Sequence, residues 1–477
     1  MYSVCCLLPI VLQFTTMKKI LFPLLSVALL TSCGIFKNYE RPESLANVTE
    51  DIYRDPTSMT AVLETADTAN FGNMPWREVF TDPQLQALIE KVLVSNDMQK
   101  ADMNIEKAKA YLTISKLAYI PSLVLAPSGE LTSIDHAKAV QTYTLPVSAS
   151  WNIGSFGSLN NAKKYAKTNL FVAKAAKQAT QTALIAAVAQ MYYTLQMLDE
   201  QHATASATAE IWSKNVEAMK AMMEAGMVNN AAVAQATANY HTLLASLPAL
   251  QNSIRQTENA LCVLLAEAPH AIARNKFGAY DFPAEMQVGI PVQLLTNRPD
   301  VRLAEAQLAA SFYNVNIARS KFYPSITISG VAGWTNNVGA VVNPGKLLLN
   351  AAASLAQPLF MNGQLVANLK ISKLDYEAAT LDFQTAVLKA GQEVSNALAD
   401  YQTAVLQQQE REKQVEVLLT ASEQTMMLFK HSNTTTYLET LTAQQSLLSA
   451  QMALITDKYN KVNAGINLYK ALGGGKE

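Results

Sequence analysis

The sequence predicts a mainly α-helical protein with a membrane β part, in which each chain gives four strands to a β-barrel shared with other copies. Three observations indicate this fold. Residues 142–153 alternate between polar and apolar side chains, residues 158–225 form a helix pattern without proline or glycine, and the same order of elements returns about two hundred residues later. A strand that leads directly into a helix of roughly 100 Å requires an architecture unlike that of an ordinary domain.

The composition supports helix-dominated packing. Hydrophobic residues make up 50% of the 477 residues, charged residues only 16% and aromatic residues 8%. This balance suits alanine-rich helices better than a typical enzyme. The formal net charge is −1, and no basic stripe is present, so no nucleic-acid partner is expected.

The N-terminus predicts export and a lipid anchor. Met17-Lys18-Lys19 is a short cationic region, residues 20–30 are apolar, and Leu30-Thr31-Ser32-Cys33 resembles a bacterial lipobox. The apolar stretch is too short to cross a bilayer as a helix, which disfavours the alternative of a transmembrane anchor. We therefore predict a signal peptide over 1–32, with Met17 as the candidate true start, and a covalent lipid on Cys33.

Few cysteines remain after this processing. Removal of residues 1–32 and lipidation of Cys33 leave only Cys262, so no intramolecular disulfide is expected. Apart from the covalent lipid, no cofactor and no metal are expected.

The processed chain divides into a tether, two structural repeats and a connector. Residues 33–75 are polar and irregular, as in an extended tether. Tyr119-Ile120-Pro121-Ser122-Leu123 and Phe322-Tyr323-Pro324-Ser325-Ile326 stand at the same point of two similar segments, which indicates an internal duplication. The predicted segments are a first repeat over 76–268, a connector over 269–291 and a second repeat over 292–477. The predicted strands cover about 121–131 and 140–153 in the first repeat, and about 325–334 and 347–358 in the second.

Each repeat ends in a long helical hairpin. Apolar residues recur at intervals of three and four along its helices, the spacing of a coiled-coil seam. The first hairpin is predicted to turn at 226–229 and the second at 433–436. Pro248 should kink the first return helix, and His202 falls on the seam as a tolerated polar residue. The glycine-rich C-terminus, from Gly473, is expected to fray.

The strands set a requirement on assembly. Strands of this length can cross an outer membrane when they are tilted, but four cannot close a barrel, and open edges in lipid leave backbone groups without hydrogen bonds. Two chains would give eight strands and a filled interior, whereas three would give twelve and room for water. The polar strand faces, rich in Ser, Thr and Asn, favour the wet lumen. A soluble antiparallel sheet with one solvated face is the alternative.

At this point the sequence resembles the TolC-like outer membrane factors, and more closely their OprM/NodT-type lipoprotein branch. The resemblance covers essentially the whole processed chain. Its motifs are the lipobox followed by Tyr39-Glu40-Arg41-Pro42, the start Trp76...Phe80-x-Asp82-x-x-Leu85...Leu88-Ile89, Asn96-Asp97-Met98...Ala101, and Arg298-Pro299-Asp300-Val301...Ala304-Glu305 before Tyr323-Pro324-Ser325.

The resemblance implies a fold, a location and a function. It implies a homotrimer with a twelve-stranded β-barrel in the outer membrane, continuous with a long periplasmic α-helical barrel. Such a protein is lipid-anchored, projects into the periplasm, and is the exit duct of a tripartite pump for drugs or other toxic compounds. Its partners would be a periplasmic adaptor (membrane fusion protein) and an inner-membrane transporter of the RND type. Two alternatives are the outer membrane component of a type I protein secretion system and a structural coiled-coil envelope lipoprotein.

The two helix turns are the candidate sites for adaptor docking or gating. In the resembling family the second turn often carries a glycine and a following aspartate, where this chain has His431-Ser432-Asn433 and Thr442. Glu439 either forms an acidic ring around the axis of a trimer or is a solvated glutamate that the helix dipole favours. The candidate residues are Gly226, Met227, Val228, Asn229, Asn433, Thr434, Thr435, Thr436 and Glu439.

No catalytic constellation is present, so no enzyme activity is expected. The five histidines are far apart in sequence, and there is no phosphate-binding loop, nucleophile elbow or zinc-protease motif. A group of methionines suggests a path for copper or silver, but methionine at seam spacing is more often core. These residues are Met191, Met219, Met222 and Met223.

We expect Cys33→Ser to leave the precursor uncleaved or to remove its acyl anchor, because the lipobox cysteine is the residue that is acylated. Mass spectrometry of protein purified from membranes measures both outcomes, and Cys262→Ser is the control that should remain acylated. Wild-type protein with an unmodified Cys33 would contradict the prediction.

Overall fold

The computed structural model describes residues 36–41, 71–133, 135, 138–155, 157–279, 297–336, 346–431 and 436–475. The described chain divides into two compact units. One lies within residues 1–42, 105–173 and 304–383, and contains the strands. The other lies within residues 43–104, 174–303 and 384–477, and contains the helical hairpins.

The described helices follow one order twice. A helix of 22 residues, α5 or α9, leads into strands, then into a helix of 67 or 68 residues, α6 or α10, and then into a return helix of 36 or 35 residues, α7 or α11. This repetition agrees with the predicted duplication. The bounds are η4 Phe71–Asn73, α3 Trp76–Val79, α4 Pro83–Val92, α5 Asn96–Leu117, α6 Ser158–Glu224, α7 Asn230–Leu265, α9 Pro299–Ser320, α10 Gln364–His431 and α11 Tyr437–Ala471.

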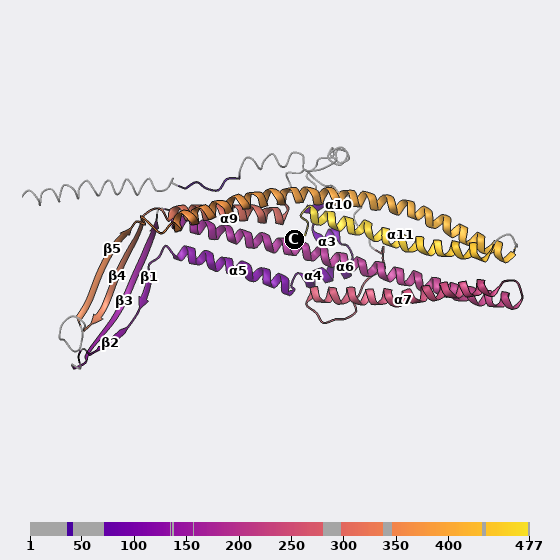
Figure 1. Cartoon of the computed structure of the whole chain (residues 1–477), viewed down its shortest axis with the longest axis horizontal. Helices are drawn as coiled ribbons and strands as arrows, with labels where there is room; N and C mark the ends of the chain where they lie inside the picture. Colours follow the sequence, from indigo (N-terminus) through magenta and orange to yellow (C-terminus); the bar gives the residue numbers. More distant parts are fainter. Residues whose placement is uncertain are drawn as a thin grey trace, which may run out of the picture. The chain divides into compact units, whose positions relative to one another are not determined.

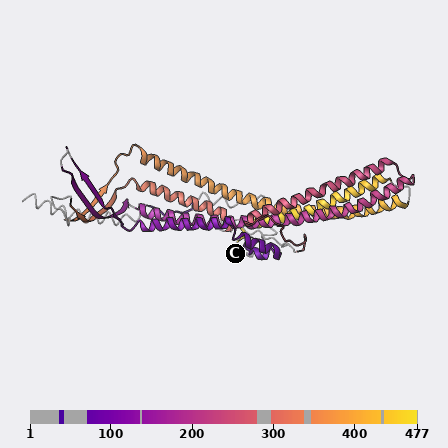
Figure 2. The ribbon, with the colours of Figure 1, turned by 90° about the horizontal axis from the view of Figure 1, so that it is seen from below.

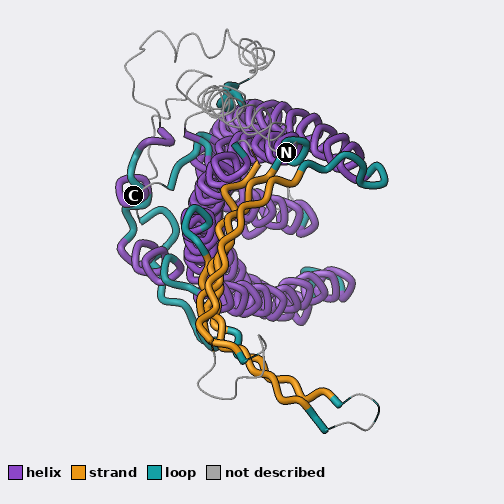
Figure 3. The backbone as a smooth tube through the Cα atoms, turned by 90° about the vertical axis from the view of Figure 1, so that its left-hand side faces the viewer, coloured by secondary structure: helices purple, strands orange, loops and turns teal. Residues whose placement is uncertain are grey.

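The strands form one antiparallel sheet in the order β1-β3-β4-β5, with β2 also paired to β3 (Figure 1). Figure 3 shows these strands in orange. The bounds are β1 Ser122–Leu125, β2 Ser128–Thr132, β3 Val140–Ser155, β4 Ser325–Thr335 and β5 Lys346–Ala356.

The strand predicted over 121–131 is interrupted. Pro127 separates β1 from β2, because proline has no N–H to give to the ladder. The register with β3 continues across the interruption: Leu125 stands opposite Val147 and Ser128 opposite Thr144. β1 and β2 therefore act as one strand, and the sheet has the four strand positions that the sequence predicts.

The helical unit is held by a core under the short N-terminal helices. Trp76, Phe80, Tyr192 and Tyr469 are all at most 1% exposed in this core. Helices α6, α7, α10 and α11 contribute to it. In Figure 2 the return helices run beside the long helices, and a second cluster packs Trp212 of α6 against Leu243 of α7.

The expectation of a frayed C-terminus is wrong for residues 473–475, which are buried. Thr182 Oγ1 donates to the Gly474 carbonyl at 2.8 Å, and the Gly475 N–H donates to Tyr469 Oη at 2.8 Å. Gly473 has a φ of +80°, and a Cβ there would lie 2.7 Å from the Asn297 carbonyl oxygen. The glycines are required because the chain end passes through a space that no side chain fits.

None of the described helices is both long enough and apolar enough to cross a membrane.

Candidate functional site

One face of the sheet is apolar in every strand. Residues that stand directly opposite in an antiparallel pair point to the same face. Leu145 is opposite Trp334, and Trp334 is opposite Leu347. The residues on this face are Leu123, Leu125, Gly129, Leu131, Tyr143, Leu145, Val147, Ala149, Trp151, Ile326, Ile328, Gly330, Ala332, Trp334, Leu347, Leu349, Ala351, Ala353 and Leu355.

This apolar face is exposed in the single chain. Leu145 is 44% exposed, Leu347 62% and Leu349 70%. A continuous apolar surface of this kind indicates contact with a membrane or a partner. The residues predicted to face lipid, Tyr143, Leu145, Val147 and Trp151, all lie on it, so the register brings together side chains that the sequence alone placed on separate strands.

The opposite face of the sheet is mainly polar. Thr144 Oγ1 and Thr335 Oγ1 share a hydrogen bond of 3.1 Å across β3 and β4, and Ser150 stands opposite both Ser122 and Ser329. A polar face behind an apolar one is the arrangement of a membrane barrel with a water-filled interior.

Both outer edges of the sheet lack a strand partner within the described chain. The pair β1 and β2 bonds only to β3, and β5 bonds only to β4. In hydrocarbon, every unpaired backbone group at these edges would cost several kcal/mol, of order 2–7 kcal/mol. The sheet therefore needs further strands at both edges.

The first predicted turn lies between α6 and α7. Gly226 has a φ of +69°, and Asn229 caps α7 by accepting a hydrogen bond of 2.9 Å from the Ala232 N–H. Met227 is 69% exposed. Val228 lies between them in the same turn.

Only part of the second turn can be placed. Asn433, Thr434 and Thr435 lie outside the described residues, as does Cys33. Thr436 and Glu439 form a capping box: the Thr436 N–H donates to Glu439 Oε2 at 3.1 Å, and the Glu439 N–H donates to Thr436 Oγ1 at 3.4 Å. The Glu439 carboxylate thus fixes the first turn of α11.

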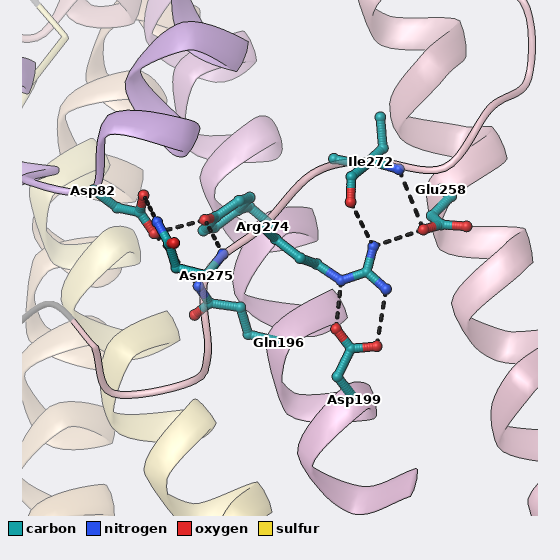
Figure 4. A network of polar contacts seen from close by, with 8 residues as sticks. Asp82, Gln196, Asp199, Glu258, Ile272, Arg274 and Asn275 are labelled. Carbon is teal, nitrogen blue, oxygen red and sulfur yellow. Dashed lines mark hydrogen bonds and ion pairs between the residues drawn. The ribbon is translucent and has the colours of Figure 1, made fainter. Parts of the chain in front are cut away.

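The described part of the connector is tied to α6 and α7 by an arginine that the sequence analysis did not single out. Figure 4 shows Arg274 donating to both carboxylate oxygens of Asp199 on α6, and at 2.6 Å to Glu258 on α7. These contacts raise the pKa of the Arg274 guanidinium, chiefly through the hydrogen bond to Asp199. An isolated arginine in a connector carries no sequence signal, because its partners lie on other elements.

A buried carboxylate completes this polar network. Asp82 is 1% exposed and accepts from Tyr192 Oη at 2.6 Å, from Asn275 Nδ2 at 2.7 Å and from the Gln84 N–H at 2.9 Å. Burial, and then the hydrogen bond to Asp82, raise the pKa of Tyr192, so its hydroxyl stays protonated and donates. The three donors offset the loss of hydration of the carboxylate.

A second arginine joins the start of α9 to α10 and to the chain end. The Arg298 guanidinium donates to Asp300 at 2.6 Å, to Glu393, and to the Ala471 carbonyl at 2.8 Å. Burial raises the pKa of Asp300, but Arg298 offsets this and holds that pKa below its usual value. The motif Arg298-Pro299-Asp300 is thus a structural clamp.

No group of three or more metal-ligating side chains is found in the part of the chain that the structure describes. Met219 is 2% exposed and lies in the helix packing.

Comparison with known proteins identifies relatives along nearly the whole chain. A family model described as outer membrane efflux protein matches residues 88–267 and 290–474. The cation efflux system protein CusC of Escherichia coli O6:H1 is 26% identical over 462 residues, which cover 95% of this chain and 98% of CusC. The probable efflux pump outer membrane protein TtgC of Pseudomonas putida is 29% identical over 473 residues, which cover 96% of each chain.

A solved structure supports the fold. The outer-membrane channel OprN superposes with a TM-score of 0.81 at 23% identity, covering 93% of this chain and 99% of that one. The predicted fold class, with strands that lead into long helical hairpins, is confirmed.

We expect Val147→Arg to destabilise the membrane-inserted protein by about 2–4 kcal/mol if the site lies near the bilayer midplane, because a charge on the lipid side must leave water. Ser148→Arg, one residue along β3 on the polar face, is the matched control and should cost little. The measurement is the denaturant midpoint of protein folded into lipid vesicles. Equal costs for the two variants would reject the assignment of the faces.

Proposed function

Since the chain belongs to the outer membrane efflux protein family, we propose that it is the outer membrane exit duct of a tripartite pump and passes small molecules, such as drugs or other toxic compounds, to the exterior. The observation that carries this proposal is the sheet, which has one apolar face, one polar face and two unpaired edges. The coiled-coil tether considered as an alternative needs no strands. A secretion duct needs them too, but the relatives' names point to efflux.

We propose that three copies close the barrel. With β1 and β2 counted as one strand, each copy supplies four strand positions, and three copies supply twelve, which leaves room for water between the polar faces. The β5 edge of one copy would pair with the β1–β2 edge of the next. The interface is then head-to-tail and closes as a ring.

Exposed apolar rows on the helices next to these edges support the same interface. On α10, which follows β5, the row has alternating steps of three and seven; on α5, which precedes β1, a shorter row ends the helix. The α10 row is Ile371, Leu374, Leu381 and Leu388, each at least 52% exposed, and the α5 row is Met103, Ile114 and Leu117, each at least 55% exposed. Coiled-coil rows of this kind are stable only when another helix covers them.

The protein is placed in the outer membrane by its family, and we propose that an acyl group on Cys33 anchors it there. The segment that follows supports this proposal. Phe36 packs edge-on against Tyr323 with ring centroids 6.3 Å apart, and Arg41 makes two hydrogen bonds of 2.7 Å to Glu305 on α9. The chain is therefore already fixed on the strand-bearing unit within a few residues of the anchor.

We propose that the helix turns meet a periplasmic adaptor of the membrane fusion type, which links the duct to an inner-membrane transporter of the RND type. The exposed Met227, the capped start of α7 at Asn229 and the capped start of α11 at Thr436 support this assignment. Capped helix ends give a partner a surface of defined shape.

The assembly and the pore can be tested together. We expect purified full-length protein to be a trimer by native mass spectrometry and to form ion-conducting pores in planar bilayers. Leu374→Asp combined with Leu381→Asp should shift the protein to monomers, because the changes bury charge in the α10 row. Lys373→Asp, on a neighbouring exposed position, should leave the trimer intact. Wild-type protein that is monomeric in mild detergent and forms no pores would reject the proposal.

The role of Glu439 is tested by two substitutions. Glutamine also fits the capping box, so Glu439→Gln should leave pore closure and cation selectivity unchanged. Glu439→Ala removes the reciprocal cap and should open the pore more often, since losing such a helix-end contact costs roughly 0.5–2 kcal/mol. Glu412→Ala, away from the turn, is the control. An altered cation selectivity in Glu439→Gln alone would instead indicate a ring of charge at the mouth.

A further inference from the structure

The return helix α7 is held differently on the two sides of Pro248. We call residues 249–265 the anchored half and residues 230–247 the tip half. In the anchored half, Glu258 Oε1 accepts from Arg274 Nη1 at 2.6 Å and from the Ile272 N–H at 3.3 Å, and Leu261 and Cys262 are fully buried in the main core. Ionic contacts and core packing thus fix this half to α6 and to the connector.

The tip half has no such attachment. Within the described residues, no side-chain hydrogen bond or ion pair joins it to another helix. The hydroxyls of Thr237, Thr242 and Ser246 all donate to carbonyls of α7 itself. Its contact with α6 is apolar, through Leu243 and neighbouring residues against Trp212. Apolar packing is non-directional, so it resists sliding and tilting less than directed hydrogen bonds do.

The other three hairpin helices are tied together along their length. Asn215 on α6 donates to Gln444 on α11 at 3.3 Å, and Thr440 Oγ1 donates to the Thr425 carbonyl of α10 at 3.3 Å. These ties lie close to the turns. Farther along, α11 is joined to α10 and α6 by Arg411–Asp457 at 3.0 Å, Gln201–Thr456 at 3.1 Å and Thr194–Tyr459 at 2.9 Å.

Pro248 lies at the boundary between the two halves of α7. Proline cannot donate the helical hydrogen bond to the Leu244 carbonyl, and its ring crowds that carbonyl, so the helix is weakest there. Ile455 stands at the corresponding position of α11, counted from the first residue of each helix, and is 8% exposed in the helix packing. The two repeats therefore differ at this point: one return helix can bend and the other is continuous.

The present arrangement also leaves one polar group of the tip half without a partner. Asn239 Nδ2 is buried and makes no hydrogen bond within the described chain. A buried donor without a partner costs free energy, so this position of the tip half is not optimal for its own side chains.

We propose that the tip half of α7 swings about Pro248 when the periplasmic mouth opens, while α6, α10 and α11 form the frame against which it moves. The swing concerns contacts within the helical unit only. Its meaning as a gate rests on the proposed duct, but the bending itself can be measured separately.

Hydrogen exchange measures the bending. In the full-length protein in detergent, amides of residues 230–247 should exchange at least about fivefold faster than those of 437–454, the equally placed part of α11. Pro248→Ala restores the N–H that Leu244 lacks and should slow exchange in 230–247 without changing 437–454. Equal rates in the two wild-type segments, or no effect of Pro248→Ala, would overturn the hinge.

Conductance measures whether the hinge gates. Pro248→Ala should reduce the frequency of pore opening in planar bilayers by a factor of about three or more, whereas Ala249→Ser, an exposed neighbour that keeps the proline, should not. Slower exchange with unchanged opening would overturn the gating role and leave the duct standing. Wild-type protein that forms no pore would refute the proposed function, and the exchange comparison alone would then decide the hinge.

Discussion

The structure depends on one constraint: a backbone N–H or C=O placed in hydrocarbon must have a hydrogen-bond partner. A chain with four strand positions cannot meet this requirement alone, so both edges of its sheet must be completed by other copies. The apolar rows on α5 and α10, at the ends that adjoin these edges in sequence, extend the same need from strands to helices. Assembly is therefore a condition of membrane insertion and not a later addition to a finished monomer.

Burial of charge in the helical unit follows a similar rule. Arg298 reaches two carboxylates and a chain-end carbonyl, and Arg274 reaches two carboxylates and the connector backbone. A guanidinium with several partners keeps most of the hydrogen bonds that it had in water, so it can join elements that are distant in sequence. The buried glycines at 473–475 add to this joint by letting backbone meet backbone where side chains would not fit.

Patterns that repeat along the chain were predictable from the sequence, and contacts between distant segments were not. Alternation in β3 and the seam of α6 identified the strands and helices, because period two and period 3.5 each belong to one kind of element. The split at Pro127 could have been inferred from the proline itself. The partners of Arg274 could not, since Asp199 and Glu258 stand on two different helices. The buried C-terminus was mistaken for a flexible one because glycine runs occur in both.

The duplication explains why the two hairpins differ in function although they share an order of elements. A repeat starts as two equal halves, and a change in one half is tolerated when the other still supports the fold. Here the second return helix keeps Ile455 in the packing and is tied to two neighbours, whereas the first carries Pro248 and is tied only beyond it. The half that lost its continuous helix is free to move because its counterpart did not. Rigidity and motion are thus divided between copies of one ancestral unit.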